Sequence, residues 1–556
     1  MAKKSKQSQI TINPGLSLGN NSAEADDDFL FECFVRTPAY DELINFDSPK
    51  MIAAGRTGAG KTAILRRIKQ DFGKTSEIDP FDISLSFIAN SDILNFLHAV
   101  GADLDLLFQV LWKHVLCVEY VRLRYSIKDE SKWKSAFANI QHVFGTDPRK
   151  RKAIEYLKNF DGKFWVPFDE NIKEVVEKIT KQLETEFDAE FQKFKSKVHY
   201  DKGISSEKRA EIIFRCKKIV TPDQLRDLSQ LVEMLAEDEK NQVKHFILID
   251  KLDENWIEDG LRFRMIRALI ETLKGFRKIR RLKIVVALRS DVLERVMQET
   301  QSLGFQKEKY EDYICDLRWT KSQLRTFISD RIQLLSRRKL YNEKLKLNDI
   351  FPRAVSGRDP FDYILERTLN RPRDLLAYFN HCLRNASGKQ EVTAAVIRES
   401  ERDYSIGRYN ALVDEWKGAF PYLAAVLTFS AEVGPVSSFA QLNAAEKVEH
   451  LILSIASDGN LKSEAIYALA ERALSNDQSQ PALELMKMAV DVLYRIGAIG
   501  VKPRNSDKFL YSHIDMPMLS AGMLTDDTKI KIHPMLVRAL NVSSEQEENT
   551  DRSAAA

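Results

Sequence analysis

One short segment of the sequence has the residue types and spacing of a loop that binds phosphate groups. It follows the pattern GxxxxGK[ST]. Glycines let the backbone wrap closely around an anion, and consecutive N–H groups at a helix N-terminus then point toward it. We expect Lys61 to reach the β- and γ-phosphates of a nucleoside triphosphate and the Thr62 hydroxyl to ligate Mg²⁺. The predicted nucleotide-binding residues are Gly55, Arg56, Thr57, Gly58, Ala59, Gly60, Lys61, Thr62 and Ala63.

A carboxylate follows a second apolar run, Phe246-Ile-Leu-Ile, and is the expected partner of this loop. Asp250 at the end of that run is predicted to hold the magnesium shell together with Thr62. Lys251 stands where a catalytic glutamate often follows the aspartate, so we expect Asp253 or Glu254 to orient the attacking water. Spacing favours Asp253 slightly. The alternative for this pair is a solvated acidic turn or a helix N-cap.

Two groups of arginines could sense the γ-phosphate. Arg289 ends the apolar run that begins at Lys283, and its alternative role is an ion pair with Asp291. Arg371 and Arg373 flank Pro372, which is typical of the first turn of a helix. An arginine on such a helix can fold back onto phosphates. Arg373 fits this role better, although an ordinary helix start with charged flanks would give the same pattern.

The stretch 262–289 is rich in arginine and lysine. It could follow the phosphates of a nucleic acid. Alternatively, Arg277, Arg280 or Arg281 could complete the site of a neighbouring subunit. The third interpretation is a solvated helix face. The basic residues are Arg262, Arg264, Arg267, Lys274, Arg277, Lys278, Arg280, Arg281, Lys283 and Arg289.

The elements that must position these residues form an α/β core. We expect parallel strands from the runs at 51–54, 246–250 and 283–289, because near-continuous apolar runs are typical of strands that are covered on both faces. Residues 83–88 are a further strand candidate. Helices are predicted from Thr62 to about Gln70 and over 103–125. Apolar residues at steps of three and four over 172–198 predict one long amphipathic helix.

The domain organisation follows from these elements and from composition. We expect a disordered tail over 1–27 and a P-loop core over 28–318 with a helical insertion at about 126–225. A helical lid over 319–400 and a helical, winged-helix-like domain over 401–542 follow, and 543–556 is a second disordered tail. In the winged-helix-like part the expected order is a helix, two strands near IGAIGVK and FLYSHI, and KIKIHPMLVRAL.

Composition restricts the possible classes of protein. The 556 residues are 44% hydrophobic and 30% charged, with a net charge of +3. Binding to nucleic acid would therefore need a local basic patch rather than bulk charge. The five scattered cysteines contain no CxxC pair, which argues against a disulfide framework. No apolar run is long enough to span a membrane and no secretory signal is evident, so we expect a cytoplasmic location.

The motifs in their order resemble the STAND, KAP and origin-recognition-like branch of AAA+-related bacterial P-loop ATPases, several of which belong to antiviral defence loci. The segments are GRTGAGKT, FILIDKLDE, VVALRSD and NRPRDLL, and the resemblance covers about 28–390. It implies a strand–helix core, a helical lid and a winged helix, with ATP and Mg²⁺ as ligands. FECFVRTPAYDEL is similar to the segment that packs on adenine in that branch.

Three functions are compatible with this sequence. The first is an ATP-hydrolysing switch that controls assembly or a separate effector protein, plausible in antiviral defence. The second is a DNA-binding ATPase or loader that uses the winged helix and the basic stretch. The third is a nucleotide-dependent scaffold with little turnover. The expected partners are ATP, further copies of the chain and an effector; DNA is an open alternative, and no membrane is expected.

Overall fold

The chain folds as two compact units in the computed structural model. Unit 1 comprises Met1–Val35, Thr57–Ala59 and Trp319–Ala556, and unit 2 comprises Arg36–Arg56 and Gly60–Arg318. The structure describes residues 11–80, 98, 101–125, 153, 155–156, 206, 210, 213–214, 222–237, 243–254, 256, 259–299, 308–339, 345–431, 434–462, 464–475, 479–504, 506 and 508–542. Within these ranges, no helix is both long and apolar enough to cross a membrane.

Unit 2 is built on a parallel sheet with the strand order β2-β3-β4-β1-β5. β1 and β4 pair with Gly55 opposite Arg289, so the ends of these two strands lie side by side. β3 is fully buried, as expected for a strand that is covered on both faces. The strands are β1 (Ile52–Gly55), β2 (Thr75–Ile78), β3 (His245–Ile249), β4 (Leu282–Arg289) and β5 (Ile314–Asp316).

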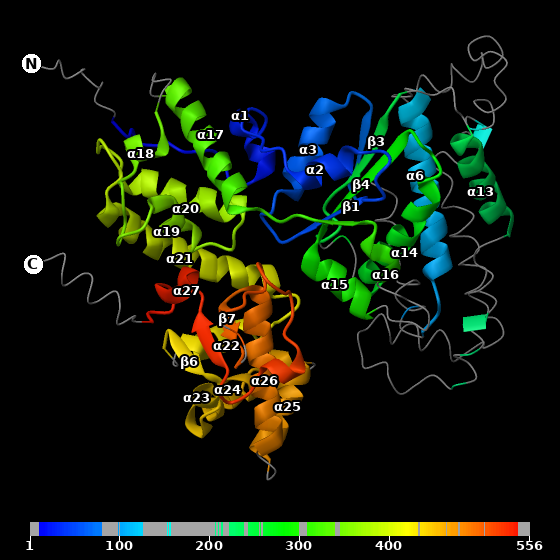
Figure 1. The fold of residues 1–556 in the computed structure, drawn as a ribbon. Helices are drawn as coiled ribbons and strands as arrows, with labels where there is room; N and C mark the ends of the chain where they lie inside the picture. The colour runs from blue at the N-terminus through cyan, green and yellow to red at the C-terminus, as the bar shows by residue number, and fades with distance from the viewer. Residues whose placement is uncertain are drawn as a thin grey trace, which may run out of the picture. The chain divides into compact units, whose positions relative to one another are not determined.

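Helices pack on both faces of this sheet (Figure 1). α3 packs on β1 and β4, whereas α6 packs on β2 and β3 and is in turn covered by α13 and α14. Trp112 of α6 is fully buried and donates from its indole Nε1 to the carbonyl of Met265 at 2.9 Å. The helices of unit 2 are α2 (Pro38–Ile44), α3 (Lys61–Asp71), α6 (Asp105–Tyr125), α13 (Pro222–Ala236), α14 (Asp259–Phe276), α15 (Ser290–Glu299) and α16 (Glu308–Glu311).

The structure confirms the predicted α/β class. The three apolar runs form β1, β3 and β4, and the two predicted helices are α3 and α6. The strand candidate at 83–88 and the long helix at 172–198 lie outside the described residues. β2 and β5 were missed because these short edge strands carry polar and half-exposed residues that show no apolar run.

Unit 1 is mainly helical. Asp359 caps α19 by accepting from the N–H groups of Phe361 and Asp362, and Pro360 opens the first turn. The helices before residue 420 are η1 (Ala23–Ala25), α1 (Asp27–Leu30), α17 (Lys321–Lys339), α18 (Leu347–Ile350), α19 (Pro360–Leu365), α20 (Pro372–Asn385) and α21 (Ala394–Trp416). The helical character predicted for 319–400 is therefore present.

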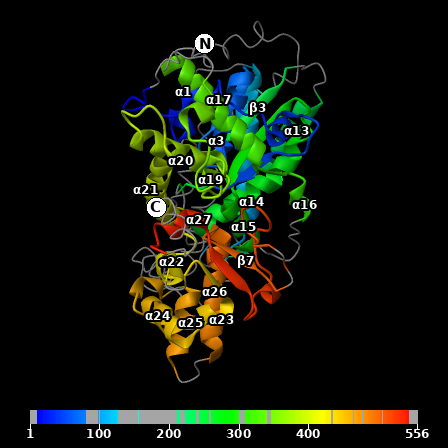
Figure 2. The same ribbon diagram turned by 60° about the vertical axis from the view of Figure 1, so that its left-hand side comes forward.

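A small antiparallel sheet with the order β6-β8-β7 completes unit 1 (Figure 2). Its strands are β6 (Val436–Ser438), β7 (Ile499–Lys502) and β8 (Lys529–Ile532). The predicted strand at FLYSHI is reduced to one bridge between Leu510 and Val501, because the following residues turn away. The remaining helices are α22 (Leu423–Ala431), α23 (Phe439–Leu442), α24 (Ala445–Ala456), η2 (Gly459–Leu461), α25 (Ala465–Leu474), α26 (Ser479–Ile496), η3 (Ala521–Met523) and α27 (Pro534–Val537).

The described part of the predicted N-terminal tail, residues 11–27, is ordered, which corrects the expectation of disorder for that part of 1–27. Ile12 and Leu18 are fully buried in the core of unit 1. Asp26 forms a buried ion pair with Arg331 of α17, and Arg331 also donates to the carbonyl of Leu18 at 2.7 Å. Composition indicated disorder because few residues of this segment are apolar, but those few anchor it together with one buried ion pair.

This ion pair leads to a prediction about stability. Asp26→Ala would leave the Arg331 guanidinium buried without its carboxylate, which costs about 3–5 kcal/mol in comparable buried pairs. We expect the midpoint of urea unfolding for unit 1 to fall clearly. The control is Glu366→Gln, which removes the exposed partner of Arg358 and should cost less than about 1 kcal/mol. Equal effects of the two variants would contradict a structural role for the tail.

Candidate functional site

The phosphate-loop motif forms the turn between β1 and α3. Gly58 and Gly60 adopt positive φ angles of 80° and 97°, which L-residues with a side chain rarely adopt. α3 begins at Lys61 directly after Gly60. The motif therefore lies in the strand–loop–helix setting of a P-loop, with the helix N-terminus at the end of the loop.

Lys61 is held against the loop from which it extends. Its ammonium group donates to the carbonyls of Gly55 and Arg56 at 3.0 and 3.3 Å. Burial lowers the pKa of Lys61, while the nearby carboxylates of Asp253 and Asp250 act in the opposite direction. A half-buried cation between carbonyls and carboxylates gains from any anion that enters the loop.

Thr62 and Asp250 meet at the ends of α3 and β3. The Thr62 hydroxyl donates to Oδ2 of Asp250 at 2.9 Å. Burial raises the pKa of Asp250, and the hydrogen bonds from the Lys251 N–H and Thr62 oppose this. A hydroxyl and a carboxylate side by side are hard oxygen donors of the kind that Mg²⁺ prefers, so these residues fit a magnesium ion.

The Lys251 side chain contacts Asp79 although Lys251 directly follows Asp250 in the sequence. Its φ of 61° lies in the left-handed region, and its ammonium group pairs with Asp79 after β2 at 2.8 Å. The ion pair fixes the direction of the partly exposed Lys251 side chain. The Lys251 side chain is thus paired with Asp79, a contact that the sequence analysis did not predict.

Asp253 and Glu254 differ in their surroundings. Asp253 is half-buried, interacts electrostatically with Lys61 and lies 3.7 Å from Nε of Arg289. Glu254 is exposed, and its N–H donates to the carbonyl of Lys251 in a turn. The structure thus brings Asp253 to the charged groups of the loop, whereas Glu254 lies at the rim.

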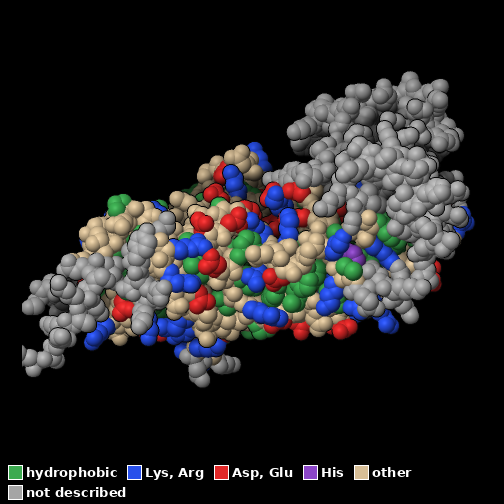
Figure 3. Space-filling view, turned by 90° about the horizontal axis from the view of Figure 1, so that it is seen from above, with side chains coloured by type: hydrophobic (Ala, Val, Ile, Leu, Met, Phe, Trp, Pro, Cys, Tyr) green, Lys and Arg blue, Asp and Glu red, His purple; other side chains and the backbone are tan. Residues whose placement is uncertain are grey.

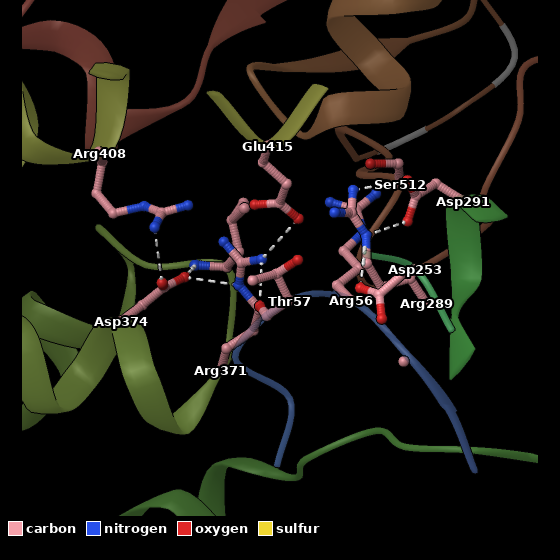
Figure 4. A network of polar contacts seen from close by, with 12 residues as sticks. Arg56, Thr57, Asp253, Arg289, Asp291, Arg371, Asp374, Arg408, Glu415 and Ser512 are labelled. Atoms are coloured by element: carbon pink, nitrogen blue, oxygen red, sulfur yellow. Dashed lines mark hydrogen bonds and ion pairs between the residues drawn. The ribbon is translucent and has the colours of Figure 1, made fainter. Parts of the chain in front are cut away.

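Arg289 at the end of β4 makes the alternative contact that the sequence analysis considered. It donates from Nε and Nη2 to both carboxylate oxygens of Asp291 at 3.0 and 2.7 Å (Figure 4). The side chain is only 17% exposed, so this is not a solvated surface pair. Arg289 and Asp253 form a charged cluster beside Lys61. Asp253 raises the pKa of Lys61, whereas Arg289 lowers it.

Most of the basic stretch serves the fold of unit 2. Arg262 donates to the Glu254 carbonyl, Arg267 pairs with Glu271, and Lys283 donates to two backbone carbonyls. Burial lowers the pKa of Lys283 to about 8. The exposed members of this stretch include Arg277, Lys278 and Arg280.

Arg371 and Arg373 both contact residues of the phosphate loop that belong to the same unit. Arg371 donates from Nη1 to the carbonyl of Thr57 at 2.7 Å. The Arg373 side chain lies against Gly58, where an added Cβ would be 2.8 Å from the Arg373 Cβ. Arg371, which the sequence analysis ranked second, makes the side-chain hydrogen bond to the loop. Arg373 packs on Gly58, and its backbone N–H donates to the Gly58 carbonyl at 3.5 Å.

Arg371 is the centre of a buried network of four charged side chains (Figure 4). Its Nε donates to Asp374 at 2.9 Å, and Glu415 lies 3.6 Å from Nη1. Arg408 contacts the second oxygen of Asp374 at 3.4 Å. Burial alone would lower the pKa of Arg371, but Asp374 and Glu415 outweigh it and raise that pKa. The sequence offered no signal for Arg408 and Glu415, because they lie on α21, far along the chain.

Comparisons with known proteins give distant similarities. A family model described as the FunZ-associated C-terminal helical domain matches residues 322–413. The chain is 21% identical over 540 residues to the "Putative transposon gamma-delta 80.3 kDa protein" of Escherichia coli strain K12, covering 94% of this chain and 67% of that protein. The chain is also similar to the solved Walker-type ATPase PABY2304 of Pyrococcus abyssi, with 12% sequence identity and a TM-score of 0.36. That alignment covers 92% of this chain and 96% of the archaeal chain. We therefore base the assignment of a P-loop fold on the loop and the sheet described above.

The geometry of the loop predicts a selective effect of adding one methyl group. Gly58→Ala would place a Cβ against Arg373 at a positive φ, which costs about 1–2 kcal/mol before any clash is relieved. We expect a lower midpoint of chemical unfolding. Gly73→Ala is the matched control, since nothing lies within 4 Å of its Cβ position and its φ is not positive. A harmless Gly58→Ala variant would contradict the loop conformation.

Proposed function

We propose that this protein is a Mg²⁺-dependent P-loop ATPase that acts as a molecular switch. The observation that carries the proposal is the contact between Thr62 and Asp250 at the mouth of the loop that contains Lys61. A phosphate-binding lysine, a hydroxyl and a strand-end carboxylate are the parts that triphosphate hydrolysis needs. The comparison with a Walker-type ATPase is compatible with this assignment but too distant to add weight to it.

Each residue has a defined task in the proposed reaction. Lys61 binds the β- and γ-phosphate oxygens, exchanging its contacts with the Gly55 and Arg56 carbonyls for stronger ones with an anion. Thr62 and Asp250 would hold Mg²⁺, which supplies charge neutralisation at the phosphates when bound. Asp253 accepts a hydrogen bond from the attacking water and orients it toward the γ-phosphorus.

Two arginines complete the proposed switch. Arg289 is released from Asp291 and turns its guanidinium toward the transferred phosphoryl group, where charge develops. In unit 1, Arg373 and Arg371 report the conformation of the loop through Gly58 and Thr57. ATP and ADP would then differ in how the loop contacts α20, which is how nucleotide state could reach a partner.

The biological setting of the switch is part of the proposal. The motif resemblance to STAND and KAP ATPases suggests control of assembly or of a separate effector, and a role in antiviral defence. Arg277 and Arg280 are exposed and available to a neighbouring subunit. A change of mass in solution between the ATP and ADP states would support assembly, and one mass in every state would contradict it.

Nucleotide binding is tested at the loop lysine. Lys61→Ala removes the cation that contacts the phosphates, and we expect ATP affinity to fall by at least about tenfold. Lys69→Ala is the matched control on the same helix, since Lys69 is exposed and pairs with Glu77. Isothermal titration on folded protein measures both. Wild-type affinity in Lys61→Ala would refute the P-loop assignment.

Hydrolysis separates the two candidate bases. We expect Asp253→Asn to bind ATP but to slow single-turnover hydrolysis by about 10²-fold, because the water loses its orienting carboxylate. Glu254→Gln, at the exposed rim, should retain most of the rate. The reverse order would assign the task to Glu254, and unchanged rates in both variants and in the double variant would exclude this loop.

A DNA-binding ATPase is the second candidate function. It is favoured by the helices α23, α24, α25 and α26 between β6 and the antiparallel pair β7 and β8 in unit 1, an arrangement that resembles a winged helix. Stimulation of hydrolysis by DNA would support it. A nucleotide-dependent scaffold is the remaining alternative, and tight ATP binding without measurable turnover would identify it.

A further inference from the structure

Every backbone carbonyl of the phosphate loop from Gly55 to Gly60 accepts a hydrogen bond. Lys61 donates to the carbonyls of Gly55 and Arg56, and the N–H of Ile64 donates to the Gly60 carbonyl at 3.0 Å. The three carbonyls between them belong to unit 1 and accept from donors of that unit. These are the carbonyls of Thr57, Gly58 and Ala59.

Trp319 is a donor to the loop that the sequence analysis did not assign. Its indole Nε1 donates to the Ala59 carbonyl at 2.8 Å. The two preceding carbonyls accept from the Arg371 side chain and from the Arg373 N–H. Ala59 is only 3% exposed, so water has little access to its carbonyl and the indole is the donor on which this group depends.

The local sequence fixes Trp319 directly before α17. The Thr320 hydroxyl accepts from the N–H of Gln323 at 3.2 Å, and the Thr320 N–H donates to Oε1 of Gln323 at 2.9 Å. This reciprocal pair is a capping box, which sets the direction in which the chain enters the helix. The Trp319 ring also packs edge-on against Phe327, with 6.1 Å between the ring centroids. Backbone and packing therefore both hold the indole in place.

Each held carbonyl also sets the direction of the next N–H group. In a trans peptide, the C=O of one residue and the N–H of the next lie in one plane and point in opposite directions. Holding the Ala59 carbonyl on one side therefore turns the Gly60 N–H to the other side, and the same relation joins Thr57 to Gly58 and Gly58 to Ala59. Within the described part of the chain, nothing accepts from the N–H groups of Gly58, Ala59 or Gly60.

These N–H groups form an anion site from the backbone rather than from charged side chains. Basic and acidic side chains are interspersed on the face drawn in Figure 3, so surface charge alone gives a phosphate no preferred place there. Gly58 and Gly60, at positive φ on either side of Ala59, give the alternation of a backbone nest for anions. The donors that hold the carbonyls thus decide how well this nest is prepared.

We propose that Trp319 is a positioning residue of the nucleotide site, whose indole holds the peptide between Ala59 and Gly60 so that the Gly60 N–H faces a bound phosphate. Trp319 acts through the loop and not on the reacting atoms. Because the loop is already ordered when a phosphate enters, binding loses less conformational entropy. The proposal rests on the proposed nucleotide binding and adds that the helical unit prepares the phosphate loop.

The first test removes the donor and keeps an aromatic ring. Trp319→Phe should bind ADP and a non-hydrolysable ATP analogue about three- to tenfold more weakly, by the same factor for both, since one hydrogen bond is lost at phosphates that both ligands contain. The loss should be larger in affinity than in the single-turnover rate at saturating ATP. Isothermal titration of full-length protein measures the affinities. The matched control is Trp416→Phe, which removes a buried indole stacked on Phe420 elsewhere in unit 1.

A second variant separates the hydrogen bond from packing. In Trp319→His, imidazole Nε2 takes the ring position that Nε1 has in indole, so the neutral ring at about pH 8 can donate to the Ala59 carbonyl. The smaller ring loses contact with Phe327. We expect Trp319→His to bind ADP more tightly than Trp319→Phe, although its midpoint of urea unfolding is lower. Affinities that follow the order of stability would overturn the positioning role.

The remaining outcomes distinguish this proposal from the proposed function. If the wild type binds neither ADP nor the ATP analogue, the P-loop assignment fails and the role of Trp319 fails with it. If the wild type binds and Trp319→Phe binds as tightly as Trp416→Phe, only the positioning role is refuted. Tighter binding by Trp319→Phe would also overturn it, because the indole would then restrain the free loop in a conformation that disfavours phosphate.

Discussion

The structure of the candidate site depends on one constraint, the placement of the Lys61 ammonium in a half-buried position beside a helix N-terminus. A cation there must be compensated, and the compensation comes from two loop carbonyls and from the carboxylates of Asp250 and Asp253. The parallel sheet makes this possible because the carboxyl ends of β1, β3 and β4 meet at one edge. The phosphate loop follows β1, Asp250 and Asp253 follow β3, and Arg289 ends β4.

In unit 1, a second group of charged side chains is more deeply buried and also needs opposite charges nearby. Arg371, Asp374, Arg408 and Glu415 are almost fully buried, and two positive and two negative groups balance. Buried ion pairs add little net stability over an apolar core, but they are costly to break. Such a network holds Arg371 in one position against Thr57. A movement of Thr57 would therefore displace Arg371 and, through the ion pairs, the side chains on α20 and α21.

The sequence by itself determined the P-loop, the three central strands and the strand-end aspartate, because close phosphate approach needs glycines and buried strands need apolar runs. It did not decide whether Asp253 or Glu254 orients the water, or whether Arg371 or Arg373 senses the phosphate, since both members of each pair fit the spacing. Only the tertiary structure directed Lys251 to Asp79, moved Glu254 to the rim and placed Arg408 and Glu415 beside Arg371. These outcomes depend on backbone direction and on contacts between distant segments. The sequence analysis missed the edge strands β2 and β5 and the order of residues 11–27 for the same reason. These segments contain few apolar residues, and only the tertiary structure shows which partners bury them.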